Sequence, residues 1–183
     1  MTRIRHAIAV ILVLALMVGC EDGGVEAEPK ESVKVGAADL RSTRSEILDL
    51  IGTAVTSASS AAGGQKLPSS DEIKSSGCDA IYPRRFRYVE VSGGFRVPNG
   101  DRASVVGKIR DAWLAEGWKP EVGGEEVAGE DDQVMSTKKA SSGVPLTIRA
   151  IVLEGSSGQP VVNIDIRTSC LELSQDALDS LDR

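Results

Sequence analysis

Apolar residues recur at spacings of three and four along residues 39–62, and this period predicts an amphipathic helix. The apolar stripe consists of Leu40, Ile47, Ile51, Val55 and Ala58. Thr43 and Glu46 have the spacing of a capping box, so we expect the regular helix to begin at Thr43. Gly63 and Gly64 then predict where the helix ends.

The same period predicts a second main helix over residues 101–116. Its apolar face consists of Val105, Ile109, Ala112 and Trp113. The Asp101 side chain is expected to cap the free N–H groups of the first turn. Gly117 is expected to end the helix, because glycine readily adopts the left-handed conformation found after the last helical residue. Near the end of the chain, residues 171–181 predict a short helix with Ser174 as its cap.

Segments rich in β-branched and aromatic residues predict the strands of one sheet. These strands cover residues 86–92, 133–140, 146–154 and 161–168, with a shorter strand over 118–122. The last of the four alternates apolar and polar residues, as half-buried antiparallel strands do, and residues 155–158 predict a hairpin before it. Gly93 and Gly94 predict a bulge or bend after the first strand, and residues 65–77 predict a loop.

The order of these elements is helix, strand, helix and then a run of strands. Such segregation favours an α+β fold, in which helices lie together on one side of an antiparallel sheet. We therefore predict a single domain over residues 39–183, built as two layers. One layer is an antiparallel sheet of four to five strands, and the other is the two main helices packed on one face.

The first twenty residues have a different pattern. Arg3 and Arg5 precede a nearly unbroken apolar run over residues 7–17, which ends at Gly19 and Cys20. A helix that spans a bilayer needs about 20 apolar residues, so this run is too short to span. Its length and its basic start are typical of a secretory signal peptide.

The four residues Met17-Val18-Gly19-Cys20 resemble the lipobox of bacterial lipoproteins, with Met where Leu is usual. The resemblance implies that residues 1–19 are a signal peptide and that Cys20 receives a thioether-linked diacylglycerol and a further acyl chain such as palmitate. Residues 20–38 are then expected to form a flexible tether, because they are polar and lack an apolar period. The alternative is an ordinary cleaved signal peptide with an incidental cysteine.

The charge of the chain narrows the choice of partners. The chain has 21 basic and 27 acidic residues, and two of the basic residues, Arg3 and Arg5, lie in the signal segment. The mature chain therefore carries 19 minus 27 charges, or −8. This acidic balance disfavours nucleic acid as a partner, and it disfavours electrostatic attachment to anionic lipid, so the expected membrane attachment is the lipid on Cys20.

Two cysteines remain after Cys20, and in an oxidising compartment they most simply form one disulfide, Cys78–Cys170. It would close a loop of 92 residues between the start of the first strand and the end of the last. The alternatives are two free thiols or a redox pair, although the chain has no CxxC spacing.

This cysteine frame is similar to that of small lipoproteins of high-GC Gram-positive (actinobacterial) bacteria. The shared features are Cys78-Asp79, Trp113 followed by Glu116-Gly117-Trp118, and Ser169-Cys170. They cover roughly half of the chain and are structural in kind. Most such proteins have no assigned activity, so the resemblance implies a place in the cell envelope and leaves the activity open.

The catalytic chemistry open to the mature chain is restricted, because its only histidine, His6, lies in the signal segment. This excludes Ser-His-Asp and Cys-His catalysis and histidine zinc sites, and we predict no enzyme activity, cofactor or metal. A hydrolase that uses two carboxylates, with Glu90 and Asp165 as candidates, is a less favoured alternative. The acidic residues of the 125–132 loop lack the calcium-loop pattern and are interpreted as a solvated loop.

Arg84, Arg85 and Arg87 form a basic cluster beside three aromatic residues. Their guanidinium groups are candidates for binding an anion, and the alternative is a solvated strand edge that deters edge pairing. The leading hypothesis is a lipid-anchored, extracytoplasmic, non-enzymatic module that binds a protein or envelope component. The second is a carrier with a small-ligand cavity between helices and sheet.

Overall fold

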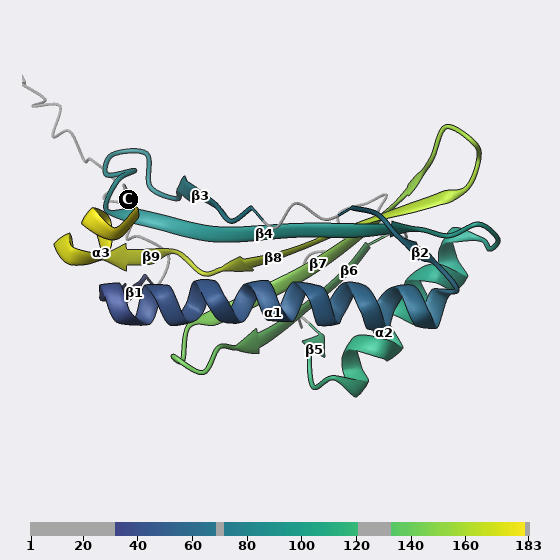
Figure 1. The fold of residues 1–183 in the computed structure, drawn as a ribbon, viewed down its shortest axis with the longest axis horizontal. Coiled ribbons are helices and arrows are strands. Elements are labelled where there is room, and N and C mark those ends of the chain that lie inside the picture. Colours follow the sequence, from purple (N-terminus) through teal and green to yellow (C-terminus); the bar gives the residue numbers. More distant parts are fainter. Residues whose placement is uncertain (1–31, 69–71, 121–132, 182–183) are drawn as a thin grey trace, which may run out of the picture.

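The structure, a computed structural model, describes residues 32–68, 72–120 and 133–181 (Figure 1). The strands are β1 (Val33–Val35), β2 (Gln65–Lys66), β3 (Lys74–Gly77), β4 (Phe86–Arg96), β5 (Lys119–Pro120), β6 (Gln133–Lys139), β7 (Pro145–Glu154), β8 (Pro160–Thr168) and β9 (Leu171–Leu173). The helices are α1 (Ala37–Ala62), α2 (Arg102–Ala115) and α3 (Gln175–Leu181).

All the described strands belong to one mixed sheet, in the order β1-β9-β4-β8-β7-β6-β5. The long strand β4 pairs with β8 and β9 on one side and with β2 and β3 on the other, always antiparallel. The strands β6, β7 and β8 form an antiparallel meander. The pair β1 and β9 is parallel, and it joins the first and last strands of the described chain.

The predicted fold class is wrong, because the sheet has nine strands instead of four to five, is mixed instead of antiparallel, and curves into a half-barrel with three helices. The prediction missed β1, β2, β3 and β9, which are two to four residues long. Strands this short show no readable period. Val33–Val35 also lies within the segment predicted as tether, yet it forms β1.

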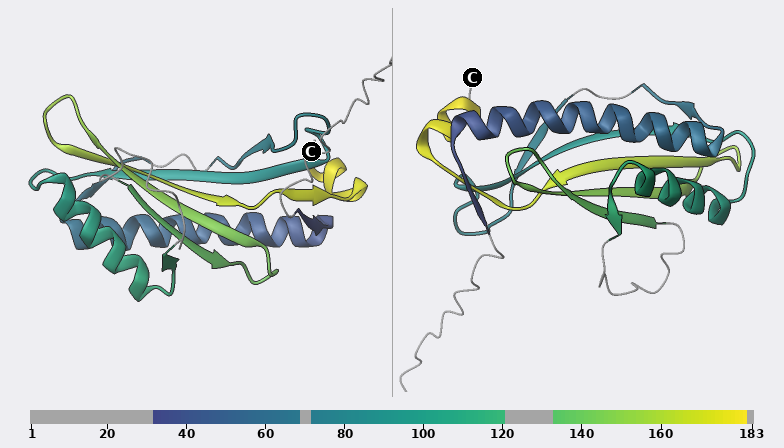
Figure 2. Two further views of the ribbon diagram at one scale, coloured as in Figure 1. Left: turned by 180° about the vertical axis from the view of Figure 1, so that it is seen from behind. Right: turned by 90° about the horizontal axis from the view of Figure 1, so that it is seen from below.

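Both main helices pack on the concave face of the curved sheet (Figure 2). The α1 helix lies along β4 and β8, whereas α2 contacts α1, β6 and β7. The buried faces of these elements form a single core, with Phe95, Trp113 and Trp118 as its largest side chains. The opposite, convex face of β4, β8, β7 and β6 carries no helix in the described part of the chain.

The helix predicted over residues 39–62 is confirmed as α1, which spans Ala37–Ala62, but the capping-box start at Thr43 is wrong. Thr43 is buried in the second turn, and its Oγ1 atom lies 2.9 Å from Ser142 Oγ. The Glu46 carboxylate accepts hydrogen bonds from the N–H (2.9 Å) and Oγ (2.6 Å) of Ser141. The residues that resemble a capping box therefore hold the β6–β7 turn, while the predicted end of the helix at Gly63 is confirmed by its left-handed φ of 68°.

The bulge predicted at Gly93 and Gly94 is also wrong, since β4 pairs with β8 without interruption through both residues. A side chain at Gly93 would place its Cβ 2.9 Å from Val55 of α1. A side chain at Gly94 would place its Cβ 2.5 Å from the Val162 carbonyl oxygen of β8. The two glycines therefore permit close approach, one of helix to sheet and the other of strand to strand.

The capping predictions for α2 are confirmed. Asp101 is its N-cap and accepts a hydrogen bond of 2.9 Å from the Ser104 N–H. Gly117 follows the helix with a φ of 83°. The C-terminal helix is shorter than predicted, because Leu171–Leu173 forms β9 and only Gln175–Leu181 is helical.

Candidate functional site

The predicted disulfide is present between Cys78 and Cys170, whose Cα atoms lie 6.0 Å apart. It links the start of the β3–β4 loop (residues 78–85) to the junction between β8 and β9. The same junction meets the start of β1, because the Val33 N–H donates a 3.1 Å hydrogen bond to the Cys170 carbonyl. We call this part of the molecule, formed by β1, β9, α3 and the β3–β4 loop, the disulfide end (Figure 1).

The β3–β4 loop is a tight turn with an apolar tip. The Asp79 carboxylate accepts hydrogen bonds of 2.7 Å from the N–H groups of both Ile81 and Tyr82. The Tyr82 carbonyl accepts bonds of 3.0 Å from the N–H groups of Arg85 and Phe86. These bonds fix the backbone, yet the side chains of Ile81 and Tyr82 are 77% and 61% exposed.

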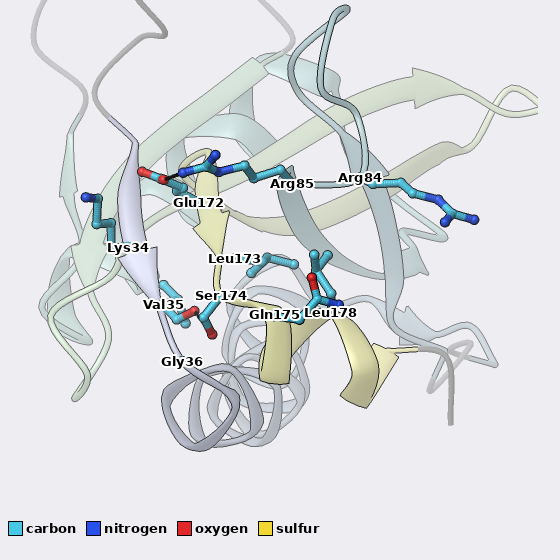
Figure 3. Close-up of a pocket in the computed structure, with 10 residues that line it drawn as sticks. All are labelled: Lys34, Val35, Gly36, Arg84, Arg85, Glu172, Leu173, Ser174, Gln175 and Leu178. Atoms are coloured by element: carbon cyan, nitrogen blue, oxygen red, sulfur yellow. Dashed lines mark hydrogen bonds and ion pairs between the residues drawn. The ribbon is translucent and has the colours of Figure 1, made fainter.

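The three arginines predicted to bind an anion lie close in sequence but are not brought to one point. Arg85 forms an ion pair with Glu172, and Arg87 donates to Ser75 through Nε (2.8 Å to Oγ) and Nη2 (2.7 Å to the carbonyl). Arg84 makes no hydrogen bond or ion pair with the rest of the described chain, and its side chain points away from its neighbours (Figure 3). The anion-binding prediction therefore depends mainly on Arg84.

A pocket of about 640 Å³ lies at the disulfide end, between β1, β9, α3 and the β3–β4 loop (Figure 3). Leu173, Leu178 and Val35 supply apolar walls, and Lys34, Arg85 and Glu172 supply charge. The pocket lies at the end of the sheet, outside the space between helices and sheet where a ligand cavity was predicted.

The carboxylate of Asp176 on α3 links two elements of the disulfide end. It contacts the Ser174 hydroxyl and accepts a 3.2 Å hydrogen bond from the Ala37 N–H at the start of α1. These two partners, the Ser174 hydroxyl more strongly, lower the pKa of Asp176 below its ordinary value of 3.8. The interaction ties α3 to the first turn of α1, whose own N-cap residue, Gly36, has no side chain to cap it.

The convex face carries the two carboxylates considered for hydrolysis. Glu90 lies opposite Arg167 in the register, and Asp165 lies two residues away on β8, so the two carboxylates are diagonal neighbours. Asp165 accepts a 3.2 Å bond from Nη2 of Arg149 on β7. The Arg167 guanidinium lies 5.2 Å from the centre of the Tyr88 ring. The carboxylates thus alternate with cations on an open strand surface.

Beside these charges lies an apolar group that sequence reasoning did not single out. It consists of Met135, Ile151, Leu153 and Val161, and we call it the convex apolar group. Leu153 pairs directly with Val161 in the register, while Met135 and Val161 are diagonal neighbours of Ile151. Only pairing between strands brings these positions together, so a single strand read alone does not reveal the group.

Several predicted features lie outside the described residues. They are Cys20 with the signal segment, and the acidic loop over 125–132. Within the described ranges, no helix is long and apolar enough to cross a membrane, and no cluster of three or more metal-binding side chains occurs.

Comparison with known proteins found no protein-family model, no curated protein and no solved structure that matches this chain.

Proposed function

We propose that this protein is a lipid-anchored extracytoplasmic lipoprotein whose folded domain binds a protein partner without catalysis. Two features support its place in the envelope: the lipobox-like residues that end at Cys20, and the Cys78–Cys170 disulfide, which persists in oxidising compartments. The net charge of −8 on the mature chain argues against nucleic acid as the partner.

The observation that carries the binding role is the composition of the convex face. A solvated face of an antiparallel sheet normally presents polar residues. Here it presents the convex apolar group together with Tyr88, Arg149 and Arg167. Tyrosine, methionine and arginine are the residue types enriched in protein interfaces, where apolar residues at the centre are surrounded by polar ones.

The size of this face also suits a protein partner. Four strands about 4.8 Å apart, each seven to eleven residues long at roughly 3.3 Å per residue, offer an area on the order of 600 Å². A stable interface buries about 800 Å² on each partner. Specific interfaces bury roughly 600 to 1,000 Å² on each partner, so this face lies at the lower end of that range.

The geometry favours binding over carboxylate hydrolysis. A glycosidase places its two carboxylates across a bound sugar in a cleft. Glu90 and Asp165 lie on the convex face, where Asp165 already neutralises Arg149. Neither residue lines the pocket at the disulfide end.

The test compares two leucines of nearly equal exposure. Leu153 belongs to the convex apolar group and is 45% exposed, whereas Leu114 lies on α2 and is 43% exposed. We expect Leu153→Lys to abolish most chemical crosslinking of the protein to its partner on intact cells, because a charge at the centre of an interface costs about 2 kcal/mol or more. Leu114→Lys is expected to leave crosslinking unchanged.

Equal crosslinking by both variants and the unaltered protein would contradict the convex face as the binding surface. Thermal unfolding of both variants serves as the control. An exposed leucine contributes little to stability, so the two melting temperatures are expected to agree with that of the unaltered protein.

A further inference from the structure

The apolar tip of the β3–β4 loop has no role in the fold or in the proposed partner site. We propose that Ile81 and Tyr82 insert into the surface of the bilayer to which the chain is anchored, so that the disulfide end faces the membrane. This inference rests on the proposed lipid anchor at Cys20, and it adds a second membrane contact that fixes the orientation of the domain.

The tip is both exposed and held in place. Ile81 and Tyr82 are more exposed than Leu114 and Leu153, the other large hydrophobic residues on the surface of the described part of the chain. The Asp79 carboxylate and the disulfide fix the backbone beneath them, so little conformational freedom is lost on insertion. Tyrosine is enriched at membrane surfaces because its ring is apolar and its hydroxyl stays hydrated.

The position of the loop matches the place where the chain from the anchor reaches the domain. The start of β1 is bonded to Cys170, and Cys170 is bonded to Cys78 at the base of the loop. Twelve residue steps separate Cys20 from Ser32, since 32 minus 20 is 12, and they span at most about 43 Å. The anchor therefore keeps this end of the domain within reach of the bilayer.

A tethered domain needs only a weak second contact. A short linker holds the loop near the bilayer at an effective concentration in the millimolar range, so a contact too weak to recruit a free protein still orients an anchored one. Two side chains at a loop tip are also too small a surface for a stable protein interface of about 800 Å² per partner. Lipid is thus the occupant that fits this tip.

The local charge agrees with a lipid headgroup. Arg84 follows the tip and has no hydrogen bond or ion pair among the described residues, and Lys34 lies across the pocket on β1. Arg85 is balanced by Glu172, so the electrostatic attraction comes chiefly from Arg84 and adds to that of the apolar tip. Asp79 and Asp176 also lie at this end, where they accept backbone hydrogen bonds from the loop and from Ala37, and salt screens the charges that lie beyond about 8 Å.

The experiment uses the full lipidated protein in vesicles of phosphatidylcholine with about one third phosphatidylglycerol. Part of the lipid carries brominated acyl chains, which quench tryptophan emission. Ile81→Trp places a probe at the loop tip, and Leu114→Trp places the matched probe on α2, away from the disulfide end. Trp113 and Trp118 are buried in the core and supply a constant background that is subtracted.

We expect roughly half or more of the added emission to be quenched at position 81 and almost none at position 114, because interfacial side chains lie about 5–10 Å deep. Adding Arg84→Glu is expected to lower the docked fraction by about fivefold or more, and only in vesicles with phosphatidylglycerol. Equal quenching at both positions, or none at position 81, would overturn the inference.

The same samples separate this inference from the lipid anchor. Intact mass and partition into a detergent phase report whether Cys20 carries lipid, whatever the loop does. A lipidated protein with an unquenched Trp at position 81 overturns the docking of the loop alone. If that loop instead crosslinks to a protein on intact cells, lipid is the wrong occupant and the inference fails.

Discussion

Replacing both disulfide cysteines, as Cys78→Ser with Cys170→Ser, is expected to lower the free energy of unfolding by up to about 5 kcal/mol. The bridge closes a loop of 92 residues and restricts the unfolded chain far more than the folded one. Domains of ordinary size are stable by about 5–15 kcal/mol, so the loss removes a large share of the total. Denaturant unfolding of the oxidised and reduced protein measures it.

The denaturant dependence of unfolding and the effect of reductant provide two further tests of the disulfide. Without the bridge the unfolded chain expands, so the dependence of unfolding free energy on denaturant should become steeper. Reductant should lower the free energy of unfolding of the unaltered protein but not that of the double variant. The double variant therefore controls for other effects of the reagent. A shift below about 1 kcal/mol would contradict a stabilising role for the bridge.

Gly94→Val is expected to destabilise the fold by about 3 kcal/mol. Its Cβ would lie 2.5 Å from the Val162 carbonyl oxygen, and the backbone of the central β4–β8 pair can yield only by moving apart. Gly52→Val is the matched control, because no neighbouring side chain lies within 4 Å of the added Cβ, the position is exposed on α1, and valine is no less favourable than glycine in a helix. Thermal and denaturant unfolding of the two variants give the comparison.

The Gly94 prediction separates two explanations of the Gly93-Gly94 pair. If the glycines permit close approach, Gly94→Val is strongly destabilising and Gly52→Val has an effect near zero. If they marked a bulge, an added side chain at Gly94 would find room beside the strand. Equal stability of the Gly94→Val variant and the unaltered protein would therefore contradict the uninterrupted register.

Local signals in the sequence predicted an element correctly where the element is long and residues that cap it or form a turn mark its ends. The α2 helix was predicted from its period, from Asp101 and from Gly117, and all three are confirmed. The meander of β6, β7 and β8 was predicted from alternation and from the turn residues between β7 and β8. In each case the deciding interactions lie within a few residues of one another.

Prediction failed where distant segments decide the outcome. The parallel pair of β1 with β9 joins residues about 140 positions apart, and no local pattern marks it. Thr43 and Glu46 have the pattern of a cap but bind a turn about 95 residues away. The convex apolar group was missed for the same reason, since it exists only once β6, β7 and β8 are in register.

The disulfide was predicted by a different route, because counting cysteines after assigning Cys20 to lipid leaves a single pair. Its presence agrees with export but does not depend on lipid. Arg84, Arg85 and Arg87 show that closeness in the sequence does not by itself form a binding site. They are close in sequence, yet their side chains are directed to Glu172, to Ser75 and to solvent.

The mass of the intact protein, purified from the membranes of cells that process it, is the measurement to make first. We expect a chain that begins at Cys20, bears a diacylglycerol and a further acyl chain, and is two hydrogens lighter than the reduced form. Cys20→Ser should abolish the lipid and release the protein from the membrane fraction. A soluble chain cleaved at another residue, with an unmodified Cys20 or none, would contradict the lipoprotein proposal.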